Sequence, residues 1–306
     1  MVKPQISTSQ TYAVSVWNDV EEAFNVRADT DDLDFWMRHA IEEIESDYSS
    51  YLNGAKVRIK PKSLQKFGKT GSLAQDTATT VAVLGASDPN ETYLSANSID
   101  GLSCTNNSYT GVITVEGHTI DTQTGYKTFV VQNVTATGNS KATLTTPLAR
   151  ATRAYTADGT FASPATAIGG AVYIYASSGV TLSGGVPQTS SSIKCVISSG
   201  DAQSKKCATA FSSVDFGIVT QIYGSASRSS ASAEIDFEFQ IANLGGLFRE
   251  RFDYTIRTAS QSGFIYNPRP FLIVPVNADC RMQVISDAAG GVVTAGFDAL
   301  FGLVQS

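Results

Sequence analysis

Apolar and polar residues alternate one by one in many short segments between about residue 72 and the end of the chain. In the segment SAEIDFEFQIAN, the apolar positions are Ile235, Phe237, Phe239 and Ile241, and acidic or amide residues fill the positions between them. A period of two indicates a half-buried β-strand, because successive side chains point to opposite faces of a sheet. Clusters of Gly, Asn, Ser and Asp separate the segments and predict turns. The alternation therefore predicts a mainly β protein.

The predicted strands share this alternation and lie at residues 80–84, 109–115, 127–134, 142–146, 171–175, 193–197, 206–211, 217–223, 233–242, 248–257, 270–276, 281–285 and 292–301. Many short strands at this spacing are typical of an antiparallel β-sandwich or barrel, and a parallel fold would need repeated βα units. Strands 233–242 and 248–257 flank the turn signal at 243–246, which predicts a hairpin. Because one strand carries an acidic outer face and the other a basic one, we expect cross-strand ion pairs.

One segment near the N-terminus has a helical period instead. Apolar residues recur at spacings of three and four between residues 31 and 52, Thr30 can cap the first turn, and Asn53-Gly54 can end the helix. We expect this helical arm to pack on the protein's own body or on a neighbouring subunit as an assembly element. The residues predicted to make that contact are Leu33, Trp36, Ile41, Ile44 and Tyr48.

A basic segment follows the acidic helical arm, and no acid interrupts it before Asp76. We expect an extended segment that docks electrostatically on a neighbouring subunit or on another acidic surface. Two ordinary solvated surfaces would explain the same charge pattern. The segment contains one aromatic residue, Phe67, so it offers no series of rings for stacking on nucleic acid, and the formal net charge of -6 also disfavours that partner. The basic residues are Lys56, Arg58, Lys60, Lys62, Lys66 and Lys69.

The length of 306 residues fits about two domains after the arm. An Ala- and Thr-rich stretch at 155–170, with Pro164, interrupts the alternation. We therefore expect an arm and basic segment at 1–71, a β domain at 72–160 and a C-terminal β-sandwich domain at 161–306. The sequence has no apolar run of membrane-spanning length, and its first residues lack the apolar stretch of a secretory signal.

The histidines and cysteines offer little for metal or nucleophilic chemistry. His39 falls in the predicted helix and His118 in a predicted turn, whereas a zinc site or a nucleophile–base pair needs several converging groups. Cys195 and Cys207 would face each other in a hairpin centred on Asp201, where they could be bonded or reduced. Without a secretory signal, reduced thiols are favoured. We predict no catalytic site, no metal and no cofactor.

Two long phrases resemble accessory virion proteins of tailed bacteriophages. They are GVITVEGHTIDTQTGYKTFVVQNVTATGNSKATLTTPLARATRAY and RPFLIVPVNADCRMQVISDAAGGVVTAGFDALF, and the likeness covers roughly residues 110–306. The resemblance implies a non-enzymatic building block, made in the host cytoplasm and repeated symmetrically on the head, neck or tail of the particle. Its partners would be other copies of itself and other virion proteins. The resemblance assigns no active-site residues.

Two other function classes fit the same sequence. A receptor-binding or fibre module for host surface glycans would present exposed aromatic residues beside a carboxylate or an amide. An enzyme, such as a depolymerising tailspike, would need at least two carboxylates that converge in a groove. The residues available for glycan binding are Tyr155, Tyr173, Tyr175, Tyr266 and Asn267.

Overall fold

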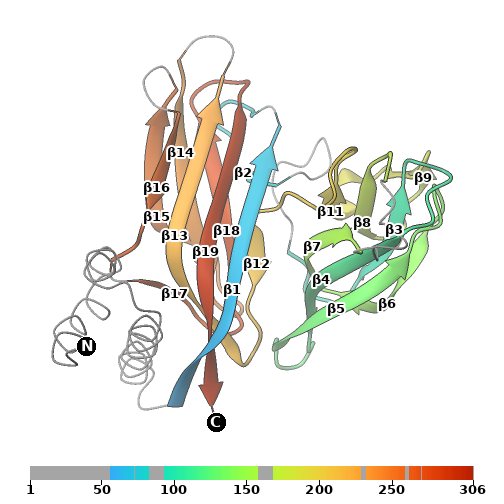
Figure 1. Ribbon diagram of the computed structural model, residues 1–306, viewed down its shortest axis with the longest axis horizontal. Helices are drawn as coiled ribbons and strands as arrows, with labels where there is room; N and C mark the ends of the chain where they lie inside the picture. Colours follow the sequence, from blue (N-terminus) through green and yellow to red (C-terminus); the bar gives the residue numbers. More distant parts are fainter. Residues whose placement is uncertain are drawn as a thin grey trace, which may run out of the picture. The chain divides into compact units, whose positions relative to one another are not determined.

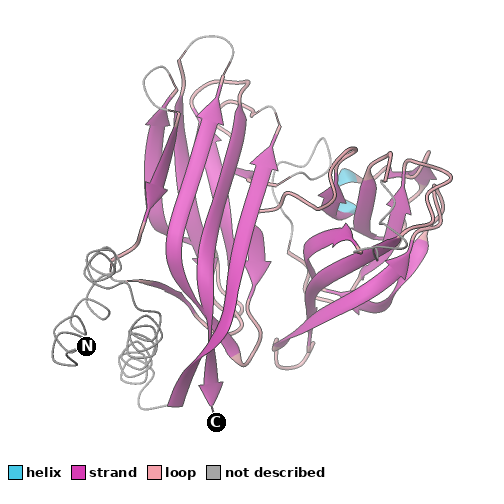
Figure 2. Cartoon of the chain, viewed as in Figure 1, coloured by secondary structure: helices cyan, strands magenta, loops and turns pink. Residues whose placement is uncertain are grey.

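The computed structural model describes residues 56–71, 73–82, 93–157, 168–228, 232–258, 262–269 and 271–305, with side chains between residues 63 and 302. The chain divides into two units, Ser63–Leu300 and a second made of Met1–Lys62 and Phe301–Ser306. The described secondary structure is almost entirely strand, apart from the short 3₁₀ helix η1 (Ser190–Ser192) (Figures 1 and 2). Within these ranges, no helix is both long and apolar enough to cross a lipid bilayer.

Two five-stranded sheets form a body that we call the main sandwich (Figure 1). The first sheet has the order β1 (Lys56–Thr70), β19 (Val292–Gln305), β13 (Asp215–Ser227), β16 (Gly263–Tyr266), and β17 (Leu272–Val274) also pairs with β13. The second sheet has the order β12 (Ala208–Ala210), β18 (Asp279–Ser286), β14 (Glu234–Ala242), β15 (Arg249–Arg257), and β2 (Thr79–Thr80) also pairs with β18. Aromatic rings fill the space between the sheets. Phe239 of β14 meets Phe297 of β19 edge to face, with ring centroids 5.1 Å apart.

The described residues between 99 and 197 form a second β body, the inserted body, which lies between β2 and β12 in chain order. One of its sheets has the order β11 (Ile193–Ile197), β8 (Val172–Ala176), β3 (Ile99–Cys104), β6 (Ala142–Leu148). The other has the order β5 (Lys127–Thr135), β4 (Val112–Ile120), β7 (Arg150–Thr156). A short hairpin pairs β9 (Leu182–Ser183) with β10 (Val186–Pro187). Leu102 of β3 and Val115 of β4 are both fully buried in one core cluster, so the two larger sheets share a core.

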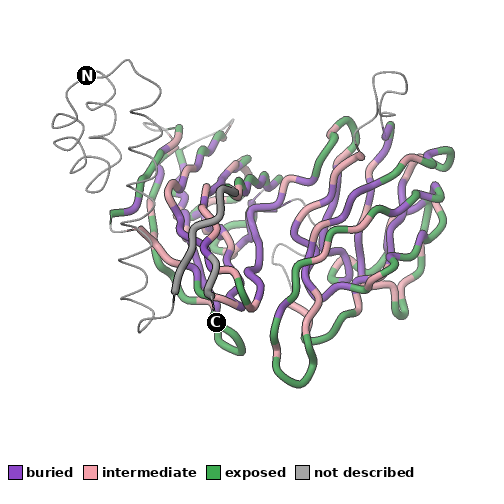
Figure 3. Tube along the Cα trace, turned by 60° about the horizontal axis from the view of Figure 1, so that its bottom comes forward, coloured by how far each residue is buried: buried purple, intermediate pink, exposed green. Residues whose placement is uncertain are grey.

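The predicted alternation governs which side chains are buried, as the alternating colours along the strands show (Figure 3). On β14, Ile235, Phe237 and Phe239 are completely buried and Ile241 is 4% exposed. These residues were predicted to share one face. The prediction of a mainly β, antiparallel protein is confirmed.

The hairpin predicted across residues 243–246 is present as β14–β15. Its register pairs Glu234 with Arg257, and these exposed side chains form the expected ion pair. Further along, Glu238 lies opposite Asp253, which sets two like charges across from each other. The outer face of the hairpin is therefore only partly charge-matched, because the register is fixed by the buried face and not by the charges.

Several strands differ from the prediction. The strands β3, β7 and β16 were not predicted. The basic segment was predicted to be extended, and it forms the long strand β1. The predicted helical arm, with Leu33, Trp36, Ile41, Ile44 and Tyr48, lies outside the described residues. The core of the inserted body takes residues from both sides of the expected domain boundary at 160/161, such as Val115 and Ile174.

Candidate functional site

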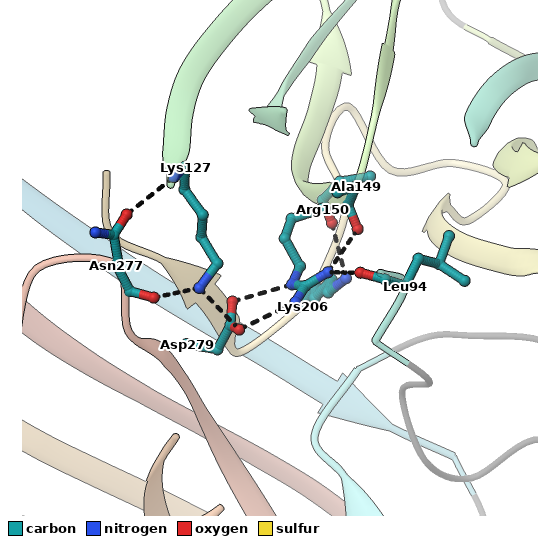
Figure 4. A network of polar contacts seen from close by, with 8 residues as sticks. Leu94, Lys127, Ala149, Arg150, Lys206, Asn277 and Asp279 are labelled. Carbon is teal, nitrogen blue, oxygen red and sulfur yellow. Dashed lines mark hydrogen bonds and ion pairs between the residues drawn. The ribbon is translucent and has the colours of Figure 1, made fainter. Parts of the chain in front are cut away.

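A buried ionic cluster centres on Asp279, at the start of β18 (Figure 4). Arg150, at the start of β7, donates from Nε to Oδ1 over 3.0 Å and from Nη2 to Oδ2 over 3.1 Å. The Nζ atom of Lys127, at the start of β5, lies 3.1 Å from the same Oδ2. The side chains of Asp279 and Arg150 are each 10% exposed and that of Lys127 is 3% exposed. The cluster thus joins two strands of the inserted body to a strand of the main sandwich.

The cluster contains two cations, Arg150 and Lys127, but only one anion, Asp279. Backbone carbonyl oxygens accept further hydrogen bonds from both cations. Arg150 Nη1 donates to the carbonyl oxygens of Leu94, over 2.6 Å, and Ala149, over 3.0 Å. Lys127 Nζ donates to the carbonyl of Asn277, whose Oδ1 accepts the Lys127 backbone N–H over 2.9 Å. Burial lowers the pKa of Lys127, whereas the charge of Asp279 acts in the opposite direction. Such a satisfied cluster is costly to break, because removing one partner leaves an uncompensated buried charge.

Two further lysines donate from the interior to strand carbonyls. Lys66 Nζ of β1 donates to the Thr152 carbonyl over 2.6 Å, and Lys206 Nζ donates to the carbonyls of Ala151 and Lys194 over 2.7 and 2.8 Å. Lys66 is only 4% exposed. Burial, followed by the charge of Lys206, lowers the pKa of Lys66 to about 8.

The buried position of Lys66 corrects its assignment to a docking surface. Along β1, residues 66, 68 and 70 are buried and residues 65, 67 and 69 are exposed, so Lys66 and Lys69 occupy opposite faces. The side chain of Lys69 is exposed, as docking requires. The side chains of Lys56, Arg58, Lys60 and Lys62 lie outside the described ones, and their role in docking stays a prediction.

His118 lies within β4 and not in the predicted turn, since β4 continues to Ile120. The side chain is 3% exposed and its ring packs against Phe129, with centroids 5.3 Å apart. Burial lowers the pKa of His118 to about 3, and the nearby charges of Lys127, Lys66 and Arg150 add to this effect. The imidazole is therefore neutral at physiological pH.

The four cysteines are free thiols, and all are buried. Cys195 lies on β11 opposite Ile174 of β8, so the predicted hairpin that would set it across from Cys207 does not form. Burial raises the pKa of the Cys207 and Cys280 thiols. Across the described ranges, no group of three or more His, Cys, Asp and Glu side chains is placed to hold a metal ion.

An open cavity of about 500 Å³ lies between β7 and the loop at 198–207. The loop runs beside the strand, because the backbone N–H of Thr156 donates to Ala202 over 2.9 Å and that of Ser204 donates to Ala154 over 2.8 Å. Ala154 faces the core, so its neighbours on β7 face outward. The residues that line the cavity are Arg153, Tyr155, Thr156, Asp201, Ala202, Gln203 and Lys205.

The cavity gathers an aromatic ring, an amide and an ion pair. Arg153 Nη2 donates to Gln203 Oε1 over 2.8 Å, and its guanidinium lies 4.7 Å from the centroid of the Tyr155 ring. Lys205 Nζ and Asp201 Oδ1 are 2.6 Å apart. A glycan site was expected to present an exposed aromatic residue beside a carboxylate or an amide. Here Tyr155 is partly exposed and lies beside the amide of Gln203 and the carboxylate of Asp201.

The other predicted glycan residues do not line this cavity. Tyr175 is 1% exposed, and its ring covers Gly101, where an added Cβ would lie 2.7 Å from Tyr175 Cζ. Tyr266 is 39% exposed and stacks on Phe252, with ring centroids 4.5 Å apart. Asn267 Oδ1 accepts a hydrogen bond from Gln221 over 3.2 Å. Tyr173 is half-buried on β8.

Comparison with known proteins found no matching family model and no matching curated protein. The chain shows a slight similarity to the VP2 subviral particle of infectious bursal disease virus, with a TM-score of 0.19, 9% identity, and coverage of 81% of this chain and 78% of that chain. For the Gx strain of the same virus, the TM-score is 0.17 with 8% identity, and coverage is 80% and 77%. TM-scores this low do not establish a shared fold.

Proposed function

We propose that the chain is a non-enzymatic structural component of a virus particle. The observation that carries this proposal is the buried ionic cluster at Asp279, which ties the inserted body to the main sandwich. Lys66 reinforces the connection, because it reaches from β1 of the main sandwich to the Thr152 carbonyl of β7. Two β cores joined by such contacts would suit a repeated particle component, whose subunits must hold a fixed shape.

Within that class, we propose an accessory protein of a tailed-phage virion, placed on the capsid surface, the neck or the tail. The resemblance of residues 110–306 to such proteins supports this narrower role. In this role the chain is made in the host cytoplasm and assembles with copies of itself and with other virion proteins.

Exposed apolar side chains on the inserted body are available for contacts between subunits. Phe129 and Val131, two positions apart on β5, are 39% and 53% exposed. Neighbouring exposed apolar residues are frequent at protein–protein contacts. The helical arm and Lys69 would then set the orientation of each subunit through packing and charge.

Light scattering of the purified protein, with and without residues 1–54, tests the assembly role. We expect a defined symmetric oligomer that dissociates when the arm is removed. A monomer that is unchanged by the truncation would contradict the role of the arm. Immunogold labelling with antibodies against the chain, on virions from cells that carry the gene, tests the location. Regular labelling at one position is expected, and absence of the protein from the particles would refute the virion role.

A second candidate function is a receptor-binding or fibre module that recognises host surface glycans. The specific observation in its favour is the cavity beside Tyr155, which holds an amide and a carboxylate next to an aromatic ring. A glycan array separates this function from the assembly role. Reproducible binding to one class of glycan supports the receptor function, and a blank array contradicts it.

A further inference from the structure

We propose that the cavity beside Tyr155 binds a neutral saccharide through its adjacent hydroxyl groups. The proposal rests on the receptor-binding alternative, to which it adds a site and a ligand class. It is independent of whether the protein is part of a virion.

Two cross-strand rows of side chains end at the cavity lining, the first with Tyr155 and Gln203 and the second with Arg153. In the first polar row, Thr114 of β4 lies between Asn133 of β5 and Tyr155 of β7, and Tyr155 in turn pairs with Gln203 of the loop. Thr114 Oγ1 donates to Asn133 Oδ1 over 2.9 Å. The row therefore sets a hydroxyl, a phenol and two amides on one face of the sheet. Each of these groups can both donate and accept, as sugar hydroxyls require.

The second polar row places opposite charges next to each other. Glu116 of β4 pairs with Arg153 of β7 in the register of the sheet. Arg153 lines the cavity, so its guanidinium can donate to one sugar hydroxyl, and the carboxylate of Asp201 in the same lining can accept from another. Burial raises the pKa of Tyr155, and the charge and hydrogen bond of Glu116 raise it further, which shows that the two rows contact each other.

The charge balance favours a neutral ligand. Arg153 and Lys205 bring two positive charges to the cavity lining and Asp201 brings one negative charge. Glu116 does not line the cavity, but it interacts with Tyr155 and supplies a second negative charge beside it. Lys205 and Asp201 already neutralise each other at 2.6 Å. A strongly charged ligand would therefore be repelled by charges of its own sign as well as attracted by charges of the opposite sign. A neutral polyol meets only hydrogen-bond donors and acceptors.

The size and rigidity of the cavity also suit a small ring. A volume of about 500 Å³ lies within the usual range for small-molecule sites. The loop is held along β7 by backbone hydrogen bonds, and Gly200, with φ of +83°, allows the tight turn in which the Asp201 N–H donates to the Ser198 carbonyl over 3.0 Å. A preorganised site loses less entropy when it binds. The Arg153 guanidinium covers one face of the Tyr155 ring, and the part of this ring that stays exposed supplies apolar surface for the C–H groups of a sugar.

Saturation-transfer difference NMR with the full-length protein tests the proposal. The probes are the methyl glycosides of glucose, galactose and mannose, with glucuronic acid as the charged comparator. We expect saturation transfer to at least one neutral hexose and none to glucuronic acid. We expect Tyr155→Ala to weaken binding at least tenfold, and Gln203→Ala, on the loop surface, to weaken it several-fold without changing the melting temperature.

Arg251→Gln is the matched control, because Arg251 is exposed on β15 of the main sandwich. It should bind as the wild type does. The proposed ligand class is overturned if glucuronic acid binds and the neutral hexoses do not. The proposed site is overturned if Tyr155→Ala and Gln203→Ala bind normally. If no probe binds, the proposed site and the proposed ligand class are both overturned. If an array detects glycan binding that these variants do not affect, the receptor function stands and this site does not.

Discussion

Arg150 holds Asp279 through two parallel hydrogen bonds, although 129 positions separate the residues in the chain. The pair is nearly buried, and Lys127 shares the same carboxylate. Because each side of the pair belongs to a different β body, the stability of one body depends on the other through this contact.

Removal of the central carboxylate should therefore be costly. We expect Asp279→Asn to lower the free energy of unfolding by about 3–5 kcal/mol, because it leaves Lys127 and Arg150 buried without their anion. Urea denaturation followed by circular dichroism measures the change. The matched control is Asp201→Asn, which breaks the partly exposed pair with Lys205 and should cost less than about 1 kcal/mol. Equal small losses for both variants would show that the cluster does not couple the bodies.

Lys66 should give stability a distinctive dependence on alkaline pH. Its folded pKa of about 8 lies below the unfolded value of 10.5. Between these values the unfolded chain binds a proton that the native lysine has lost, so this residue's contribution to stability rises with pH. Relative to Lys66→Met, the wild type should gain about 3 kcal/mol between pH 7 and 10.5. Urea titrations of both proteins across that range measure the gain, and a constant difference would contradict the lowered pKa.

His118 should make the free energy of unfolding depend on pH in the acidic range. Its folded pKa of about 3 lies below the ordinary 6.5. Between these values only the unfolded chain binds the proton, so the contribution is complete above pH 6.5 and is lost as pH falls toward 3. Between pH 7 and 4, the wild type should lose about 3 kcal/mol more than His118→Gln. Thermal or urea melts at both pH values measure the difference. Parallel pH profiles for the two proteins would mean that His118 titrates normally.

The contact between Phe239 and Phe297 should contribute strongly to the packing of the main sandwich. Both rings are completely buried. We expect Phe297→Ala to cost about 3–5 kcal/mol, because the cavity lies between two sheets that cannot easily collapse. Leu247→Ala removes a side chain that is 86% exposed and should change stability by less than about 0.5 kcal/mol. If the two variants melt alike, the rings do not hold the sheets together.

The β14–β15 hairpin was predictable, because its alternation and its turn signal are local in the sequence. The partners of Asp279 were not predictable, because no local sequence pattern indicates which strand ends will meet. The burial of Lys66 could have been suspected from the sequence. Once the basic segment is treated as a strand, an even and an odd position such as 66 and 69 must lie on opposite faces.

The candidate glycan site was predictable only by residue type. Tyr155 was one of several available tyrosines, and the sequence could not rank it above Tyr175, which fills the core. Arg153 and Gln203 were not predicted to contribute. They meet because the loop after β11 pairs with β7, a contact across 50 positions that depends on the tertiary fold.

The position of the inserted body in the chain has a consequence for protein synthesis. Thr80 of β2 pairs with Gln283 of β18, so the main sandwich cannot close until residue 283 has left the ribosome. The inserted body, in contrast, draws its core from residues 99–197. Because contacts distant in sequence form slowly and domains fold as units during translation, we expect the inserted body to fold first. The earliest strands of the main sandwich would then wait for their partners, and the nascent chain would be most vulnerable to aggregation during that interval.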